Sequence, residues 1–236
     1  MTKKYVIFKD DDVGVDTPKL KRWIEIVIKN DAKATVGLIG KYMKDEELIS
    51  YLNSLDNSKI EIFCHGYHHK HYPYIIRNIT KSKDLPKTEF NKDIEKHNSS
   101  LKKYRTHEAN LLHSKTITFG PQGNIWNKDV IIPLLEHDFK MMFSWENVGG
   151  GILTIPLSGN LEHESLKDFI KCYEEHENDV IYTLQFHHAK YTDKNFEVME
   201  QVIDYLKNKE RRVFVTPSDL FSISQNNKEV YSIMSK

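Results

Sequence analysis

The chain contains little cysteine and has no excess of charge of either sign. Its 236 residues include two cysteines, and its 34 basic residues equal its 34 acidic residues. Cys64 and Cys172 cannot form a disulfide framework, and no CxxC pair indicates thiolate-held zinc or thioredoxin-like chemistry. We therefore expect two reduced thiols in the core. Because the chain carries no overall basic field, nucleic acid and anionic lipid are not its expected partners.

Long apolar runs are also missing. The chain begins MTKKYVIFKDDD, in which only residues 5–8 are apolar before charge resumes. This run is too short for a signal peptide or a membrane span, so we expect a cytoplasmic protein that does not enter a membrane. Hydrophobic residues still make up 39% of the chain, enough for a substantial core. The length suits an α/β barrel that folds as one unit, and we expect one domain over residues 1–236.

Short apolar runs alternate with amphipathic stretches along the chain. The runs predict strands at Tyr5–Asp10, Ala34–Ile39, Lys59–Cys64, Thr116–Phe119, Lys140–Ser144, Ile152–Ile155, Val180–Phe186 and Val213–Thr216. Beyond a first helix that starts at Asp16, helices are expected at Asp45–Leu55, Glu89–Lys103, Lys128–His137, His163–His176 and Asp193–Lys209. This alternation predicts parallel βαβ units in an α/β fold, and a barrel is their simplest closure.

Two segments carry clear local signals. The first helix opens with Asp16-Thr17-Pro18, a capping residue followed by a proline at the start of the helix. The segment Lys70–Lys87 breaks the alternation with two prolines and a cluster of tyrosines. We expect a long functional loop there rather than a linker.

Polar residues at strand ends are the candidates for chemistry, because the active site of a parallel barrel lies where strands end. At residues 8–14 the sequence FKDDDVG takes an apolar strand into three consecutive carboxylates. Like charges this close repel unless a cation or a proton separates them. The run is therefore either a cation-binding strand end or a solvated acidic turn that caps the next helix.

The second strand end, IFCHGYHH at residues 62–69, is rich in histidine, the commonest metal ligand, of which the chain has 12. His65 and His69 stand four residues apart, a spacing that on one helical turn aims both rings at a single point. We interpret His68 and His71 as loop residues or as residues behind the ligands. With an upstream carboxylate, the pair would complete the two-histidine, one-carboxylate set of a catalytic zinc site.

Two further strand ends complete the set. At residues 118–124 the sequence TFGPQGN forms either an ordinary tight turn or a place where a ligand approaches the backbone closely. At residues 183–188 the sequence TLQFHH ends in a candidate general acid or base, or else in a hydrogen-bonded core histidine. In a regular strand Gln185 shares the face of His187, and His188 points to the opposite face. His187 and His188 are therefore alternatives for the general acid or base.

Together the four strand ends resemble the metal-dependent polysaccharide deacetylase family, whose motifs run in the same order: Asp-Asp, His-x-x-x-His, a turn with proline, and a late Leu-x-x-His. The resemblance spans residues 11–187. It implies removal of acetyl groups from N-acetylated or O-acetylated sugars on a distorted (β/α) barrel of seven or eight mostly parallel strands. It also implies roles for five residues: Asp11 is the catalytic base, Asp12, His65 and His69 are metal ligands, and His187 is the acid that protonates the leaving group.

The register within the acidic run stays open, because Asp10-Asp11 could be the matching pair. We prefer Asp11-Asp12, since the Val13-Gly14 that follows resembles the Asp-Asp-x-Gly form of some branches.

The third motif departs from the family's usual form. The family usually opens this motif with an arginine that orients the catalytic aspartate, whereas this chain has Phe119-Gly120-Pro121. Its arginines lie elsewhere, at Arg22, Arg77, Arg105, Arg211 and Arg212. The form Phe-Gly-x-x-Gly-Asn resembles a divergent branch. Either another cation such as Lys9 holds the base, or the role of the base has changed.

The resemblance further implies a divalent metal, zinc first and cobalt, nickel or manganese as alternatives, with an acetylated sugar or oligosaccharide as substrate. Asp11 would take a proton from metal-activated water, and protonated His187 would give one to the leaving group. Backbone N–H groups of the Gly120–Gly123 turn would donate hydrogen bonds to the oxyanion. The rings of Tyr67 and Trp145 would either stack on the sugar or pack at the rim of the site. The expected substrate contacts are Tyr67, Gly120, Pro121, Gly123, Asn124 and Trp145.

Two other functions compete with deacetylation. The missing arginine favours a catalytically weak relative that binds carbohydrate or metal. A metal-assisted hydrolase of another bond would use the same residues and differ only in its product.

Overall fold

A computed structural model describes residues 3–69, 87–160 and 165–235. Its strands are β1 (Lys4–Val13), β2 (Ala34–Leu38), β3 (Ile60–Cys64), β4 (Thr118–Phe119), β5 (Met141–Ser144), β6 (Leu153–Pro156), β7 (Gly159–Asn160), β8 (Ile181–Phe186) and β9 (Arg212–Phe214). Every pairing between these described strands is parallel. The predicted α/β fold with a parallel sheet is therefore confirmed.

The sheet curls into a half-barrel, as in distorted (β/α) barrels. Its strand order is β6-β5-β4-β3-β2-β1-β8-β7, and β9 pairs with the start of β1. The two ends of this order are neighbours in sequence, because only Leu157 and Ser158 separate β6 from β7. Leu157 N donates to Ser144 O on β5, and Ser158 N donates to Thr183 O on β8, each at 3.0 Å. The chain thus changes its partner strand between β6 and β7.

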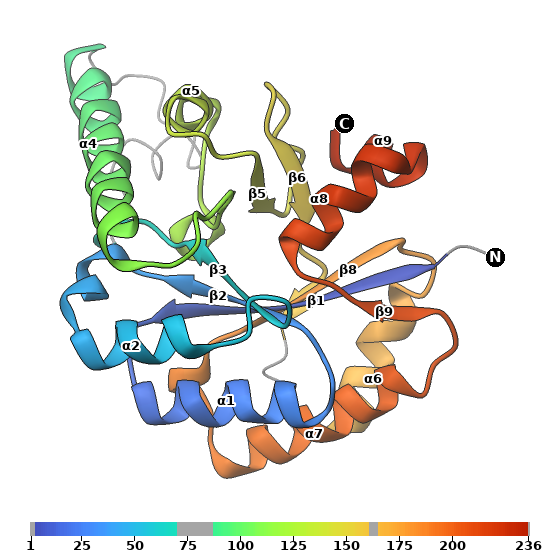
Figure 1. Ribbon diagram of the computed structural model, residues 1–236. Coiled ribbons are helices and arrows are strands. Elements are labelled where there is room, and N and C mark those ends of the chain that lie inside the picture. The colour runs from blue at the N-terminus through green and yellow to red at the C-terminus, as the bar shows by residue number, and fades with distance from the viewer. Residues whose placement is uncertain (1–2, 70–86, 161–164, 236) are drawn as a thin grey trace.

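Helices flank the sheet on both sides. They are α1 (Thr17–Lys29), α2 (Glu46–Ser54), α4 (Lys87–Leu111), α5 (Ile131–Glu136), α6 (Leu166–Glu175), α7 (Asp193–Lys207), α8 (Pro217–Asn226) and α9 (Lys228–Ser235). Short 3-10 turns lie at Gly40–Lys44, Gln122–Asn124, Lys128–Val130 and His188–Lys190. In Figure 1, α1, α2, α6 and α7 lie below the sheet, whereas α4 and α5 rise at the upper left and α8 and α9 at the upper right.

Strand β1 separates two hydrophobic cores. Val6 and Phe8 belong to the core under the helices, where Phe8 meets Phe186 edge to face at 5.6 Å between ring centroids. Tyr5 and Ile7 belong to the second core, inside the curled sheet. Because side chains alternate along a strand, the residues that follow continue this division. Asp10 therefore lies on the helix side, and Lys9 and Asp11 lie on the inner side.

All eight predicted strands are present, with ends shifted by at most three residues. The sequence reasoning missed β7, which is only two residues long, and the helices α8 and α9. Helix α8 had a readable start, because Thr216 caps it in a capping box and a proline follows. The expected helix at residues 128–137 is divided into a 3-10 turn and α5. The expected loop at residues 70–87 falls outside the described residues, apart from Lys87 at the start of α4.

The expectation of two core thiols is half correct. Cys64 is buried at the end of β3, but Cys172 is exposed on α6, so the second thiol is not a core residue. None of the described helices is both long and apolar enough to span a bilayer.

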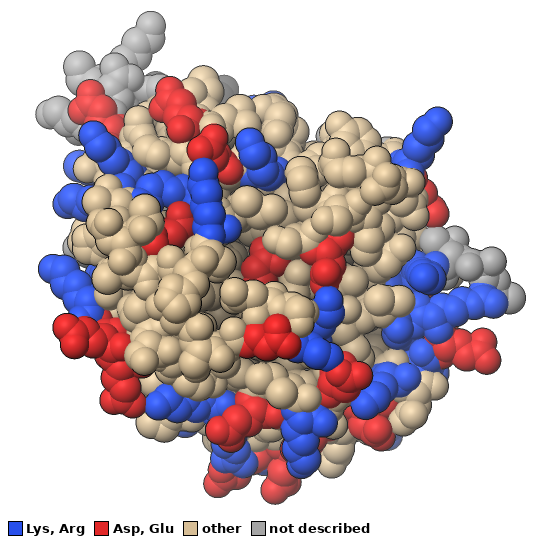
Figure 2. All heavy atoms as spheres, viewed as in Figure 1, with Lys and Arg blue, Asp and Glu red and all other residues tan. Residues whose placement is uncertain are grey.

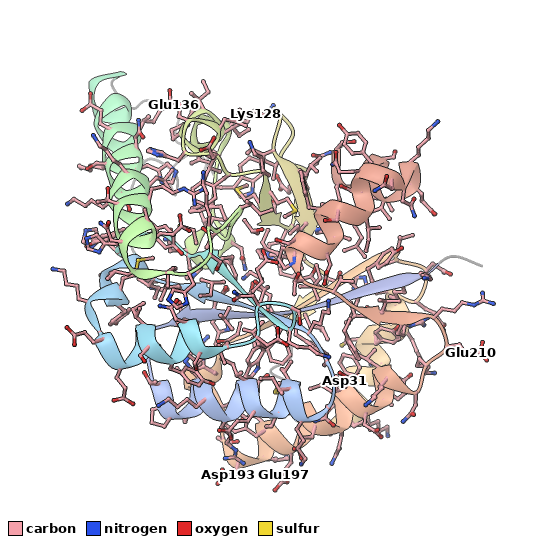
Figure 3. All side chains as sticks on the ribbon, viewed as in Figure 1. Asp31, Lys128, Glu136, Asp193, Glu197 and Glu210 are labelled. Atoms are coloured by element: carbon pink, nitrogen blue, oxygen red, sulfur yellow. The ribbon has the colours of Figure 1, made fainter. Side chains whose placement is uncertain are left out.

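Charged side chains of both signs are interspersed over the face shown in Figure 2, in keeping with the net charge of zero. Side chains labelled in Figure 3, among them Glu136 on α5 and Asp193 and Glu197 on α7, project from the edge of the molecule. Among the described residues, the buried lysine, aspartate and glutamate side chains are Lys4, Lys9, Asp10, Asp11 and Glu108.

Candidate active site

A β-bulge at the end of β1 separates the three consecutive carboxylates. Asp10 pairs with Val36 of β2 and Val13 pairs with Leu38, so three residues on β1 advance against two on β2. Asp12 sits in the bulge with φ 65°, the left-handed region that few non-glycine residues adopt. Strain of this kind often marks a residue with a functional role. The three carboxylates consequently have three different surroundings.

His65 and His69 meet in a loop, not on a helical turn. Gly66 has φ 73° and His69 has φ 38°, and no helix is assigned between β3 and α4 within the described residues. The expected helical geometry is therefore wrong, although the two rings do converge, with centroids 5.3 Å apart. The carbonyl of Gly120 accepts a hydrogen bond from His65 Nδ1 at 2.8 Å. This bond fixes the tautomer and leaves the lone pair of His65 Nε2 free to bind a metal.

Asp12, His65 and His69 form a site whose ligand atoms fit one cation. These atoms lie within 4.8 Å of one another. Asp12 Oδ1 is 3.4 Å from His65 Nε2 and 2.9 Å from His69 Nε2. Two ligands of a tetrahedral zinc, each about 2.0 to 2.2 Å from the metal, lie about 3.3 to 3.6 Å apart. The 3.4 Å spacing of Asp12 and His65 lies within this range, whereas the 2.9 Å spacing of Asp12 and His69 is about 0.4 Å below it, so these two groups must separate slightly to hold such an ion.

The state of Asp12 supports this fit. Its Oδ1 atom is buried and accepts no hydrogen bond with acceptable geometry from any described residue, and a buried polar atom of this kind needs a partner. Burial by itself would raise the pKa of Asp12, but the imidazoles of His65 and His69 outweigh it and hold the pKa well below its usual range. Asp12 is therefore ionised, and its oxygen converges with Nε2 of both histidines, an arrangement that a cation would complete.

Asp11 lies on the inner side of β1, beside the three ligands. Lys9 donates to both of its carboxylate oxygens, at 2.5 Å to Oδ1 and 2.6 Å to Oδ2. Asp11 Oδ1 is also 3.9 Å from His65 Nδ1, and Oδ2 is 4.0 Å from His187 Nε2. The side chain of Asp11 is 4% exposed. The structure thus places the expected base within 4.0 Å of the expected acid and of one expected metal ligand.

The two late histidines have separate surroundings. His188 is fully buried, and its Nδ1 lies 2.6 Å from Asp10 Oδ2, while its backbone N–H donates to Asp10 Oδ1 at 2.9 Å. His187, by contrast, is partly exposed and faces Asp11. The expectation that the two histidines point to opposite faces is confirmed. Since Asp10 is occupied by His188 on the helix side, the alternative Asp10-Asp11 register does not fit this geometry.

The glycine and proline turn packs under the histidine loop. The side-chain amide of Gln122 donates to His65 O at 2.6 Å, and a Cβ on Gly66 would lie 1.6 Å from Gln122 Nε2. Glycine at 66 is favoured by its positive φ, and a larger side chain would also displace the Gln122 amide from its hydrogen bond to His65 O. Sequence reasoning missed Gln122, because neither its spacing nor its residue type distinguished it.

One expected role within this turn needs correction. Gly120 N donates to Cys64 O at 2.9 Å, so this N–H is used in the pairing of β3 with β4 and cannot serve an oxyanion. Pro121 is buried, and Gly123 and Asn124 both have positive φ, at 62° and 56°. Asn124 Nδ2 donates to Gln185 Oε1 at 2.9 Å. Of the turn's expected contacts, Gly123 and Asn124 are the more exposed.

The two aromatic candidates are placed differently. Trp145 is 52% exposed and directly follows β5, which fits a rim residue. Tyr67 is only 7% exposed, and its ring packs edge to face on His68 and His107. This burial does not suit the expected stacking of Tyr67 on a sugar, and we assign it to the core instead.

Comparison with known proteins identifies the family of this chain. The family model for polysaccharide deacetylase matches residues 1–137, more than half of the chain. The chain therefore belongs to the polysaccharide deacetylase family. The match includes the acidic run, the histidine loop and the glycine and proline turn, and ends before His187. A search of curated proteins gave no match.

Several solved structures share the fold. A protein from Mycobacterium smegmatis described as a polysaccharide deacetylase has a TM-score of 0.71 at 12% identity, over 97% of this chain and 92% of its own. An acetyl xylan esterase of family 4 from Clostridium thermocellum, solved with a cobalt ion, has a TM-score of 0.63 at 16% identity, over 94% and 92%. A family 4 carbohydrate esterase pseudoenzyme from Bacillus anthracis has a TM-score of 0.59 at 19% identity, over 89% and 63%. At these identities the likeness concerns the fold alone.

Proposed function

We propose that this protein is a metal-dependent hydrolase that removes an acetyl group from an N-acetylated or O-acetylated saccharide. One observation carries the proposal: a carboxylate, Asp11, is held beside three converging ligand atoms, with an imidazole, His187, 4.0 Å from it. Membership of the polysaccharide deacetylase family supports the acetylated substrate.

We propose Asp12, His65 and His69 as the residues that hold a divalent metal. Zinc suits two nitrogens and one carboxylate oxygen, with cobalt, nickel and manganese as alternatives. The metal-bound relative from Clostridium thermocellum was solved with cobalt. When bound, such an ion polarises the acetyl carbonyl and acidifies a water molecule. The remaining tasks, proton transfer and orientation, belong to groups of the chain.

Proton transfer requires a base and an acid at different positions. We propose that Asp11 accepts the proton of the attacking water, because its carboxylate lies next to the ligand His65, 3.9 Å from Nδ1. His187, protonated, donates to the departing amine or alcohol, and its partial exposure gives it access to substrate. The backbone N–H groups of Gln122 and Gly123 remain as candidates for the oxyanion, since that of Gly120 is used within the sheet.

Metal content and acetate release test this function together. Purified protein is analysed for bound metal and is incubated with acetylated xylan and with oligomers of N-acetylglucosamine, and the acetate released is measured. We expect one metal per chain and acetate from at least one substrate, with Asp11→Asn retaining metal and losing at least 100-fold in rate. Acetate release that is equal in Asp11→Asn and wild type would contradict the assigned base.

A catalytically weak protein that binds metal or carbohydrate is the second candidate. The shared fold with a pseudoenzyme from Bacillus anthracis favours it, because the fold exists without the activity. Bound metal without acetate from any substrate of the panel would support this second candidate and reject the first.

A further inference from the structure

Lys9 is a lysine buried inside the barrel with no access to water. It is 0% exposed, on a strand where nearly every residue is buried. An isolated ammonium in such a place is costly unless charged and polar partners surround it. All three of its N–H donors have acceptors within 3.1 Å: Asp11 Oδ1, Asp11 Oδ2 and Gln185 Oε1. The ammonium is therefore fixed in position by its own contacts.

Aromatic rings complete the surroundings of this ammonium. The rings of Phe63 and Phe143 each lie 5.3 Å from Lys9 Nζ, within the range of a cation–π contact. These rings belong to the inner core, on the same side as Asp11. Lys9 reaches Asp11 because side chains two apart on a strand point the same way. Lys9 thus contacts the Asp11 carboxylate from the inner side of the curled sheet.

Phe119 stands where the family resemblance implies an arginine, and its side chain is buried in the core on the helix side of the sheet. A Cβ on Gly120 would lie 2.3 Å from the ring of Phe63, so a longer side chain cannot enter without moving that ring. Phe119 is itself buried, against the ring of Phe139. None of the described arginines forms an ion pair with Asp11, whose partners within 4.0 Å are Lys9, His65 and His187.

We propose that Lys9 is the positioning residue of the base: it holds the Asp11 carboxylate in one orientation by contacting both of its oxygens, in place of an arginine from the third motif. This inference rests on the proposed function, because the base is the one named there. A carboxylate on a short side chain can rotate about two bonds, and two-point contact removes that freedom. Gln185 ties the same ammonium to Asn124, at 2.9 Å from its Nδ2, so the turn and the base are connected.

The test uses Lys9→Met, which keeps an unbranched side chain of similar length and removes the ammonium. Lys4→Met is the matched control, because Lys4 is also buried on β1, with its ammonium 4.6 Å from the ring of Tyr173. Seven residues of strand place Lys4 about 23 Å from Asp11. We expect Lys9→Met to lower kcat at least 100-fold, with KM and bound metal within about threefold of wild type, and Lys4→Met to keep the wild-type kcat.

A double-mutant cycle separates positioning from simple structural damage. In an Asp11→Asn background, which lacks the carboxylate that Lys9 is proposed to position, Lys9→Met should change the residual rate by less than about threefold. Crystal structures of metal-loaded wild type and Lys9→Met provide a readout that does not depend on activity, and we expect the Asp11 carboxylate to be rotated in the variant. Equal kcat in wild type and Lys9→Met, additive effects in the cycle, or an unmoved Asp11 would each overturn the proposal.

The two proposals fail in different ways. If wild type binds metal and releases no acetate, the proposed function fails, and the positioning role is then decided by the orientation of Asp11 in the two crystal structures. If wild type releases acetate and Lys9→Met does so equally well, the proposed function stands and the role of Lys9 fails.

Discussion

The imidazole of His188 is enclosed between two acceptors on the helix side of the sheet, directly behind the candidate active site. Its Nδ1 lies 2.6 Å from Asp10 Oδ2, and its Nε2 contacts the backbone carbonyl of Val15. Because both ring nitrogens face oxygen acceptors, both carry a proton and the ring is an imidazolium. The pair connects the end of β1 to the turn after β8, and so holds the loops that present Asp12 and His187.

This ion pair predicts a loss of stability at alkaline pH. Burial lowers the pKa of His188, but the charge and hydrogen bond of Asp10 outweigh burial and raise it above the usual value. Since the folded pKa is the higher one, the stabilisation is complete below the unfolded pKa of about 6.5 and is lost as pH rises through the folded pKa. In urea unfolding, the advantage of wild type over His188→Asn should therefore be larger at about pH 6 than at about pH 9. An advantage of equal size at both pH values would show that His188 is uncharged.

His97 predicts the opposite dependence, a loss of stability in acid. Its ring is buried next to Phe119, at 5.8 Å between centroids. Burial, with a contribution from His137, lowers the pKa of His97 to about 4. The unfolded chain takes up the proton first, so wild type should lose up to about 3 kcal/mol as pH falls from about 6.5 to about 4. His97→Phe should remove most of this slope in denaturant unfolding, and an unchanged slope would place the acid sensitivity elsewhere.

The assigned ligands predict which histidines hold metal. His65→Ala and His69→Ala should each abolish stoichiometric metal binding, because each removes one of three protein ligands. His68→Ala is the matched control, since His68 is exposed in the same loop and lies outside the triad. Metal per chain is measured by elemental analysis after dialysis. Retention of metal by both ligand variants, or its loss in His68→Ala, would show that the ligand set is wrong.

Gly66 predicts a structural cost that extends to the metal site. Gly66→Ala introduces a Cβ 1.6 Å from Gln122 Nε2 at a φ of 73°, and should reduce the free energy of unfolding by about 2 to 3 kcal/mol. Gly149→Ala, at φ 65° with nothing within 4 Å of the new Cβ, should cost only about 1 kcal/mol. Metal affinity should fall in Gly66→Ala alone, because its neighbour His65 is a ligand. Equal costs for the two variants would remove the close packing of Gln122 as a cause.

The fold was readable from the sequence because its strands are nearly all buried. Runs such as residues 34–39 and 59–64 contain the apolar pattern of strands covered on both faces, and helical patterns lie between most of the strands. A two-residue strand such as β7 carries no such pattern. Helix α8 has a capping box at Thr216 but only a modest apolar stripe, and capping residues without a clear stripe do not predict a helix.

Residue type and spacing predicted which residues form the site, but they did not predict its geometry. The ligands Asp12, His65 and His69 lie at or just after strand ends, so their side could be inferred. The loop geometry of the histidines, however, depends on the left-handed Gly66, which spacing does not show. The pairing of Asp10 with His188 requires that β1 and β8 be neighbours, and strand order is not written in local sequence. The buried state of Tyr67 depends on α4, far along the chain.

The most direct test of the central claim is the dependence of acetate release on metal. Protein stripped by a chelator is titrated with zinc, and in parallel with cobalt, while acetate from an acetylated saccharide is measured. The account predicts no release by the stripped protein and a rate that rises to a plateau at one metal per chain. Stripped protein that releases acetate as fast as metal-loaded protein would contradict it.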